Sequence, residues 1–125
     1  MEQKHKHANL EDRLIAFGVG IVNLGYQLQK FKELKPISDQ ILRSGISPAL
    51  NYGEALHAES KKDFIHKMKV ALKELHETLT SLKILSSLRN NPDLEEVQRL
   101  KKENGELVAI FISSVRTAKR NSLNK

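Results

Sequence analysis

The chain has 125 residues and a mass of 14.2 kDa, which is the size of one ordinary domain. Hydrophobic residues make up 39% of it, enough for one core, and the lack of cysteine excludes a disulfide framework, a thiolate metal site and a cysteine nucleophile. Lysine and arginine outnumber aspartate and glutamate by 21 to 15, so the net charge is +6. A basic chain attracts nucleic acid or an anionic membrane surface.

An apolar run at residues 14–22 follows several basic residues, as it would in an export signal. Glu11 and Asp12 directly precede the run, however, and no small-x-small cleavage site follows it. The run is also shorter than the ~18 residues that are needed to cross a bilayer. We therefore expect a cytoplasmic protein that binds no membrane.

The first predicted helix covers residues 9–33 and carries two apolar stripes. The core stripe alternates steps of four and three, the spacing of one buried helical face: Leu10, Leu14, Phe17, Ile21, Leu24, Leu28 and Phe31. The second stripe has the same spacing on another side of the helix: Ile15, Val19, Val22 and Tyr26. A helix that is apolar on two sides must bury both, so we expect the second stripe to contact another copy of the chain. The alternative is that a small bundle covers this helix on two sides.

Two glycines, Gly18 and Gly25, lie between these stripes. Glycine in a helix interior costs about 1 kcal/mol relative to alanine, so we expect another backbone to approach closely there.

The second helix is predicted to open at Pro36, because proline suits the first helical turn. The apolar spacing continues to Leu56, and Pro48 predicts a kink or a break inside this helix. The expected inner face consists of Ile37, Ile41, Gly45, Ala49, Tyr52 and Leu56.

The third helix is predicted to start at Ser60–Asp63, which resembles a capping box. Its expected core face consists of Phe64, Met68, Ala71, Leu72, Leu75, Leu79, Leu82 and Leu85. The fourth helix is predicted to start with Asn91 as N-cap and Pro92 as its first residue. Asn104 falls on the inner face of this helix and needs a hydrogen-bonding partner.

Four helices with short connections predict an all-α, antiparallel up-down-up-down four-helix bundle. We expect a single domain at residues 9–120, a flexible N-terminal arm at residues 1–8 and a flexible C-terminal tail at residues 121–125.

The chain carries few signs of catalytic or metal chemistry. Helical bundles hold metal ions through Glu-x-x-His pairs on facing helices. Glu54 and His57 have that spacing, but the related pair, Asp63 and His66, falls on the polar side of the third helix. No spacing suggests a catalytic triad, and no glycine-rich loop is suited to cradle phosphate. We expect no metal site, no cofactor and no enzymatic activity.

The basic residues are better organised. A stripe follows the third helix opposite its core face: Lys62, His66, Lys69, Lys73 and His76. A second cluster lies near the C-terminus: Arg116, Lys119, Arg120 and Lys125. Both groups can contact phosphates of RNA or DNA, and an oligomer would add their weak contacts together. The alternatives are a solvated outer face, which the stripe considered alone favours, and a favourable interaction of the cluster with the helix dipole.

A longer pattern covers residues 40–85, QILRSGISPALNYGEALHAESKKDFIHKMKVALKELHETLTSLKIL. It falls on Leu42, Arg43, Ser44, Gly45, Ser47, Asn51, Glu54, Ala55, Ala58, Ser60, Lys62, Asp63, Phe64, Ile65, Lys67, Ala71, Leu72, Lys73, Glu74, Glu77 and Thr78. In this stretch the chain resembles the bacterial four-helix bundle proteins that are named for open reading frames within 23S ribosomal RNA intervening sequences.

The resemblance implies an up-down bundle that commonly assembles as a homopentamer. It also implies similarity to the accessory variability determinant of diversity-generating retroelements. Such proteins are thought to bind nucleic acid and a reverse transcriptase through a basic surface, and the family has no established enzymatic activity.

Together, charge and resemblance predict a non-enzymatic homo-oligomer that binds RNA or DNA. We expect the phosphate contacts to come from Lys62, Lys69, Lys73, Arg116, Lys119 and Arg120. A reverse transcriptase or another nucleic-acid enzyme is a further expected partner. The alternative is a protein-interaction scaffold that has no nucleic-acid ligand.

Overall fold

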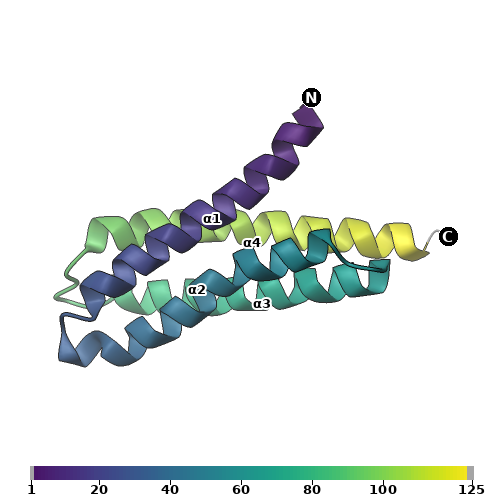
Figure 1. Ribbon diagram of the computed structural model, residues 1–125. Coiled ribbons are helices and arrows are strands. Elements are labelled where there is room, and N and C mark those ends of the chain that lie inside the picture. The colour runs from purple at the N-terminus through teal and green to yellow at the C-terminus, as the bar shows by residue number, and fades with distance from the viewer. Residues whose placement is uncertain (1, 124–125) are drawn as a thin grey trace.

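The computed structural model describes the backbone of residues 2–123 and the side chains of residues 10–121. The elements are α1 (Glu2–Leu28), the short 3-10 helix η1 (Lys32–Leu34), α2 (Lys35–Leu56), α3 (Lys61–Ser86) and α4 (Leu94–Leu123). Consecutive α-helices run antiparallel, and residues 2–123 contain no strand (Figure 1). The predicted all-α, up-down-up-down bundle is confirmed.

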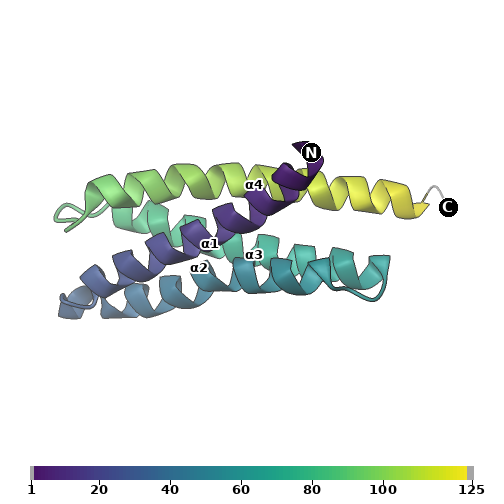
Figure 2. The ribbon, with the colours of Figure 1, turned by 45° about the horizontal axis from the view of Figure 1, so that its top comes forward.

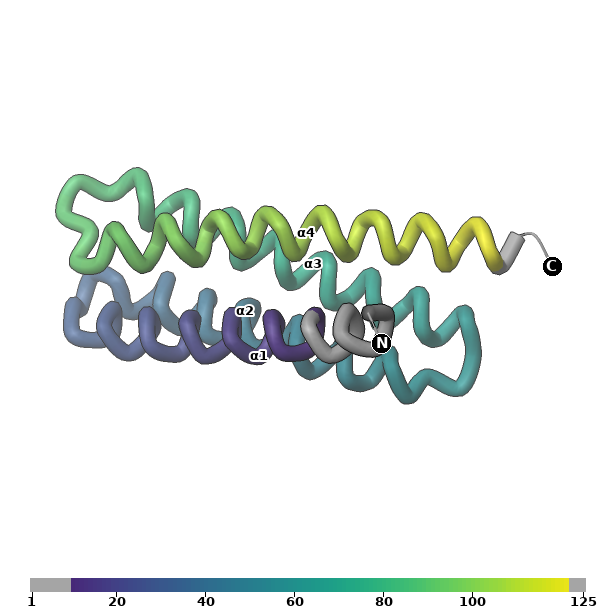
Figure 3. The backbone as a smooth tube through the Cα atoms, turned by 90° about the horizontal axis from the view of Figure 1, so that it is seen from above, coloured from purple at the N-terminus to yellow at the C-terminus, as the bar shows by residue number. Residues whose placement is uncertain are grey.

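Each α-helix packs against the next one along the chain, and the contact between α2 and α3 is the most extensive. Seen from above, α1 lies over α2, and α3 runs obliquely beneath α4 (Figure 3). α1 is inclined to the other helices and contacts α4 much less than it contacts α2 (Figure 2). The molecule therefore has one side built by α1 and α2 and another built by α3 and α4.

The core lies between the four helices and contains most of the residues predicted from the apolar spacing. Its largest fully buried side chains are Leu14, Ile21, Leu24, Leu28, Ile41, Met68, Leu75, Leu82, Leu85, Leu100, Leu107 and Phe111. The rings of Tyr52 and Phe111 meet edge-on across the centre, with centroids 6.0 Å apart. Leu56 was expected in the core but is 44% exposed, because α2 ends there.

The end of α1 differs from the prediction. The helix stops at Leu28 rather than near Glu33, and the Gln29 amide then donates to Ser38 Oγ at 2.9 Å and Asp39 Oδ1 at 2.8 Å, which ties the end of α1 to the start of α2. Phe31 consequently leaves the core stripe and is 43% exposed.

The start of α1 also differs, since the helix begins at Glu2 and not near Asn9. Most side chains of residues 1–8 and 121–125 lie outside the described residues. The flexible arm and the flexible tail therefore stay predictions.

Two of the predicted helix starts are confirmed and one is shifted. Pro36 lies in the first turn of α2, and Ser60 Oγ accepts a hydrogen bond from the backbone N–H of Asp63 at 3.0 Å. α4 begins at Leu94 rather than Pro92, and Asn91 Oδ1 accepts from the N–H of Asp93 at 3.0 Å. α2 continues unbroken through Pro48, which is buried within the bundle.

Glycines allow α1 to pack closely. A Cβ atom at Gly25 would lie 2.6 Å from Leu42 Cδ2, and one at Gly45 would lie 2.7 Å from Ile21 Cγ2. The predicted approach of another backbone is not found at Gly25, where the close atoms belong to the Leu42 side chain. A Cβ at Gly18 would lie 4.0 Å from the nearest atom, the backbone oxygen of Gly45.

Asn104 points inward, as its position predicts, and is fully buried. Its amide N–H donates to Leu75 O at 3.0 Å, and its amide oxygen accepts from the N–H of Leu79 at 3.1 Å. The side chain thus joins α4 to the backbone of α3.

Candidate functional site

The second stripe of α1 lies on the surface of the bundle. Its four side chains are exposed by 52%, 55%, 42% and 74% for Ile15, Val19, Val22 and Tyr26. Ile46 and Leu50 of α2 are exposed beside them, and we call these six residues the apolar face. Between α1 and α2 this face holds a groove of about 320 Å³ in which Asn23 is the one polar lining residue among those described.

The described part of the bundle does not cover α1 on two sides, so the second stripe stays on the surface. Its contact with another copy of the chain stays a prediction. Contiguous apolar surface on a soluble protein marks an interaction site more often than scattered apolar residues do.

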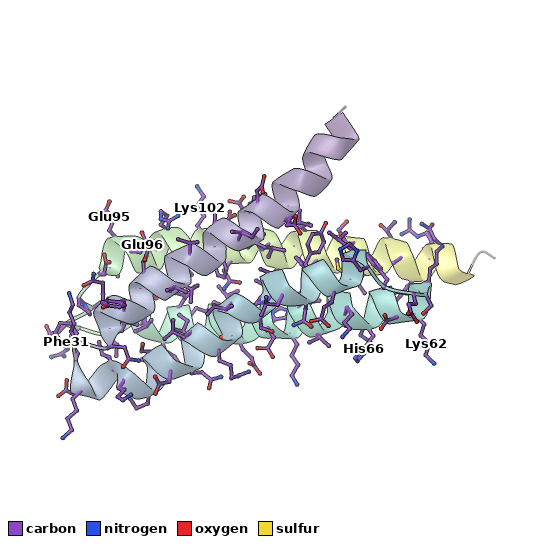
Figure 4. All side chains as sticks on the ribbon, viewed as in Figure 1. Phe31, Lys62, His66, Glu95, Glu96 and Lys102 are labelled. Atoms are coloured by element: carbon purple, nitrogen blue, oxygen red, sulfur yellow. The ribbon has the colours of Figure 1, made fainter. Side chains whose placement is uncertain are left out.

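The basic stripe of α3 points away from the core along its whole length. Lys62, His66, Lys69, Lys73 and His76 are all exposed. Figure 4 shows Lys62 and His66 pointing away from the bundle near the start of α3. None of the three lysines forms an ion pair with the described side chains.

The stripe is longer than the sequence analysis recognised. Thr80 and Lys83 continue it by steps of four and three, and Lys83 is also exposed. The same spacing could have identified Lys83 from the sequence. We call Lys62, His66, Lys69, Lys73, His76 and Lys83 the basic ridge.

The acids of α3 face α2. Arg43 of α2 donates from Nη1 to Glu74 at 3.4 Å and from Nη2 to Glu77 at 3.1 Å. Lys67 reaches in the opposite direction, from α3 to Glu54 of α2, at 2.8 Å. These ion pairs neutralise carboxylates on the α2 side, and the ridge lysines form no ion pair with the described side chains.

Burial raises the pKa of Glu74, and the neighbouring Glu77 raises it further, while Arg43 lowers it. The side chain of Glu74 is only 14% exposed, which explains the leading effect of burial. The carboxylate therefore lies at the boundary between α2 and α3, where Arg43 and the neighbouring Lys73 both lower its pKa.

The acids of α4 face α1 in the same way. Arg13 of α1 donates to Glu103 at 2.7 Å and to Glu106 at 3.0 Å, and the hydrogen bond that it donates to Glu103 is the main cause that raises the pKa of Arg13. Glu96 lies near the start of α4 (Figure 4). It pairs with Arg99 of the same helix. That hydrogen bond lowers the pKa of Glu96.

The predicted C-terminal cluster is exposed on the last turns of α4. Arg116, Lys119 and Arg120 form no ion pair with the described side chains, and Lys125 lies outside the described residues. Because α3 and α4 are antiparallel, the cluster lies at the end of the bundle where the ridge begins (Figure 1). We call the ridge and the cluster together the basic face.

Glu54, His57 and Asp63 line one open hollow where α2 ends and α3 begins. Glu54 accepts a hydrogen bond from Lys67, and among the described residues no three acidic or histidine side chains are placed to hold a metal ion. Within residues 2–123 no helix is both long enough and apolar enough to span a membrane.

Comparison with known proteins extends the resemblance beyond residues 40–85. Residues 10–113 match the model of the family described as 23S rRNA-intervening sequence protein. The chain is also similar to a solved structure from Bacteroides thetaiotaomicron, a protein with unknown function from the S23 ribosomal protein family. The two are 35% identical, with a TM-score of 0.78 over 85% of this chain and 97% of that chain. No curated protein matches the chain.

Proposed function

The chain belongs to the 23S rRNA-intervening sequence protein family, and we propose that it is a non-enzymatic helical bundle that binds RNA or DNA through its basic face. We further propose that it does so as a homo-oligomer held together by its apolar face. One observation carries the proposal: Glu74 and Glu77 of α3 pair with α2, and Glu103 and Glu106 of α4 pair with α1. The exposed lysines of the ridge form no ion pair with the described side chains.

Phosphate binding follows from that separation of charge. Unpaired lysine and arginine side chains release counterions from a nucleic acid when they contact its phosphates. The proposed contacts are made by Lys62, Lys69, Lys73, Arg116, Lys119 and Arg120, all of which are exposed. Contacts of this kind position a protein on the nucleic acid and do not read its sequence.

Self-association follows from the apolar face. Burying an exposed valine or isoleucine contributes about 1.5–3 kcal/mol, so six such side chains favour an interface. The proposed partner is a second copy of the chain, and the resemblance to the family favours a homopentamer. Each added subunit brings another basic face, so weak phosphate contacts add as multivalent binding.

A reverse transcriptase or another nucleic-acid enzyme remains the proposed protein partner, and the resemblance to the family is its support. The alternative function is a protein-interaction scaffold without a nucleic-acid ligand. The groove between α1 and α2 favours this alternative, because an apolar groove is suited to a protein segment, and the basic charge would then serve solubility alone.

The first experiment is size-exclusion chromatography of the protein purified from cells, at low and high salt, with light scattering and the ratio of absorbance at 260 and 280 nm. The chain has no tryptophan and two tyrosines, so carried nucleic acid dominates the absorbance. We expect an oligomer with bound nucleic acid that high salt removes. A clean oligomer at both salt concentrations would favour the scaffold.

A charge-reversal variant tests the basic face directly. Lys69→Glu with Lys73→Glu should weaken nucleic-acid binding and flatten its salt dependence. The matched control is Lys30→Glu with Lys32→Glu, which makes the same charge change on exposed residues between α1 and α2. Equal binding by the two variants would contradict the proposed role of the ridge.

A further inference from the structure

The basic ridge is a straight and rigid row of charge. It lies on α3, a single helix that contains neither glycine nor proline. At about 1.5 Å per residue, Lys62 and Lys83 lie about 32 Å apart along the helix axis. That length matches about one turn of a nucleic-acid duplex, which repeats every ~34 Å.

The ridge carries no phenylalanine, tyrosine or tryptophan, and its aromatic side chains are the small imidazoles of His66 and His76. Tyr26 and Phe31 are the exposed tyrosine and phenylalanine side chains among the described residues, and both lie outside α3 and α4. On α3 and α4, Phe64 is half-buried and Phe111 is fully buried. α3 also has no asparagine or glutamine that could read a base edge.

These features separate two kinds of nucleic acid. Proteins that bind single strands combine a basic groove with aromatic side chains, and each stacked base contributes about 1–3 kcal/mol. A duplex keeps its bases inside and carries one charge per ~1.7 Å of its axis, twice the density of one strand. A face that offers lysines and arginines but no large aromatic side chain therefore gains more from the duplex.

We propose that the basic ridge binds the phosphate backbone of double-stranded nucleic acid and discriminates against single strands. This inference rests on the proposed function, because it names the ligand class of the same face. It also adds Lys83 to the residues that contact phosphate.

The test compares three fluorescently labelled probes with the full-length protein: a 20-base-pair DNA duplex, the RNA duplex of the same sequence and one unstructured DNA strand. Anisotropy titrations between about 50 and 200 mM salt give the affinity and its salt dependence. With about four phosphate contacts, affinity should fall about 150-fold for a duplex and about 50-fold for the strand across that range. Duplex binding should be tighter by about threefold or more at the lower salt.

Each outcome has a distinct meaning. Tighter and more salt-dependent binding of either duplex supports the inference, and the two duplex probes show whether DNA or RNA geometry is preferred. Equal or tighter binding of the single strand overturns the inference and leaves the proposed function standing. Failure to bind all three probes overturns both.

A variant at the two ends of the ridge tests its length. Lys62→Gln with Lys83→Gln should reduce the slope of log affinity against log salt by about 2 for the duplex, since each phosphate contact contributes about 0.9. Lys30→Gln with Lys32→Gln is the control and should leave the slope unchanged. If the ridge variant leaves the slope of log affinity against log salt unchanged, the duplex does not follow α3.

Discussion

The outward stripes of α1 and α3 have the same helical spacing and opposite chemistry. On α1 the stripe is Ile15, Val19, Val22 and Tyr26, and on α3 it is the row of lysines and histidines from Lys62 to Lys83. Both lie opposite the core of the same bundle. The comparison shows that the inward stripes build the core, while the outward stripes give the two sides of the molecule different surface chemistry.

Salt concentration separates the two faces experimentally. Contacts between phosphates and lysines weaken steeply as salt rises. Burial of apolar surface contributes about 25 cal/mol per Å² and does not depend on charge. Self-association through the apolar face and nucleic-acid binding through the basic face should therefore respond differently to the same change of buffer.

The largest expected effect comes from the packing beneath the apolar face. Gly45→Val places a side chain where a Cβ alone would lie 2.7 Å from Ile21 Cγ2, so α1 must move from α2. We expect a loss of about 3 kcal/mol in the free energy of unfolding, measured by urea denaturation. Gly105→Val is the control, because its Cβ would meet no atom within 4 Å. Equal stability of both variants would contradict the close packing of α1 on α2.

The next largest effect breaks the apolar face itself. Val19→Glu with Val22→Glu puts two charges into the proposed interface between copies, so light scattering should show the monomer mass of 14.2 kDa. Thermal unfolding of that monomer should change little, because the two valines are 55% and 42% exposed. Ile84→Glu with Leu88→Glu alters exposed apolar residues elsewhere and should leave the oligomer intact. An unchanged mass for the valine variant would remove the interface from the proposal.

A smaller effect is expected at the C-terminal part of the basic face. Replacing Arg116, Lys119 and Arg120 by Gln should lower the slope of log affinity against log salt by up to about 3. The oligomer mass should stay the same, because these residues lie outside the apolar face. The corresponding control replaces Lys30, Lys32 and Lys35 by Gln. A slope equal to that of the control would restrict nucleic-acid binding to α3.

The smallest effect concerns Glu74, which lies at the boundary between α2 and α3. Its pKa in the folded protein is raised above the ordinary value of 4.5, so the folded state holds its proton more tightly than the unfolded chain. Its contribution to stability therefore falls as pH rises through the region just above 4.5. In Glu74→Gln this decrease should be absent, and urea denaturation at about pH 4 and 7 measures the difference. An identical pH dependence in both proteins would place Glu74 in a solvated position.

The inward stripes were predictable from sequence because helical spacing is a local property. Leu14, Ile21 and Leu75 are buried as their spacing indicates. The prediction that Phe31 is buried was wrong, because α1 ends at Leu28. Contacts between the end of α1 and the start of α2 outweigh the helical spacing there.

The separation of paired acids from exposed lysines was harder to predict from the sequence. Arg13 pairs with Glu103, 90 residues away, and such a pair exists only once α1 lies beside α4. Spacing alone showed where the lysines of α3 lie on the helix, but it did not show that Glu74 and Glu77 would be neutralised by Arg43 of α2. The phosphate-binding role of the ridge stays a prediction.

The buried amide of Asn104 sets the longitudinal register of α4 against α3. If α4 slid by one turn, about 5.4 Å, the amide would leave Leu75 O and the N–H of Leu79 and would lie unsatisfied in the core, at a cost of about 1–3 kcal/mol. The ridge belongs to α3 and the C-terminal cluster belongs to α4. The buried, uncharged side chain of Asn104 thus fixes the axial offset between the cations of α3 and those of α4.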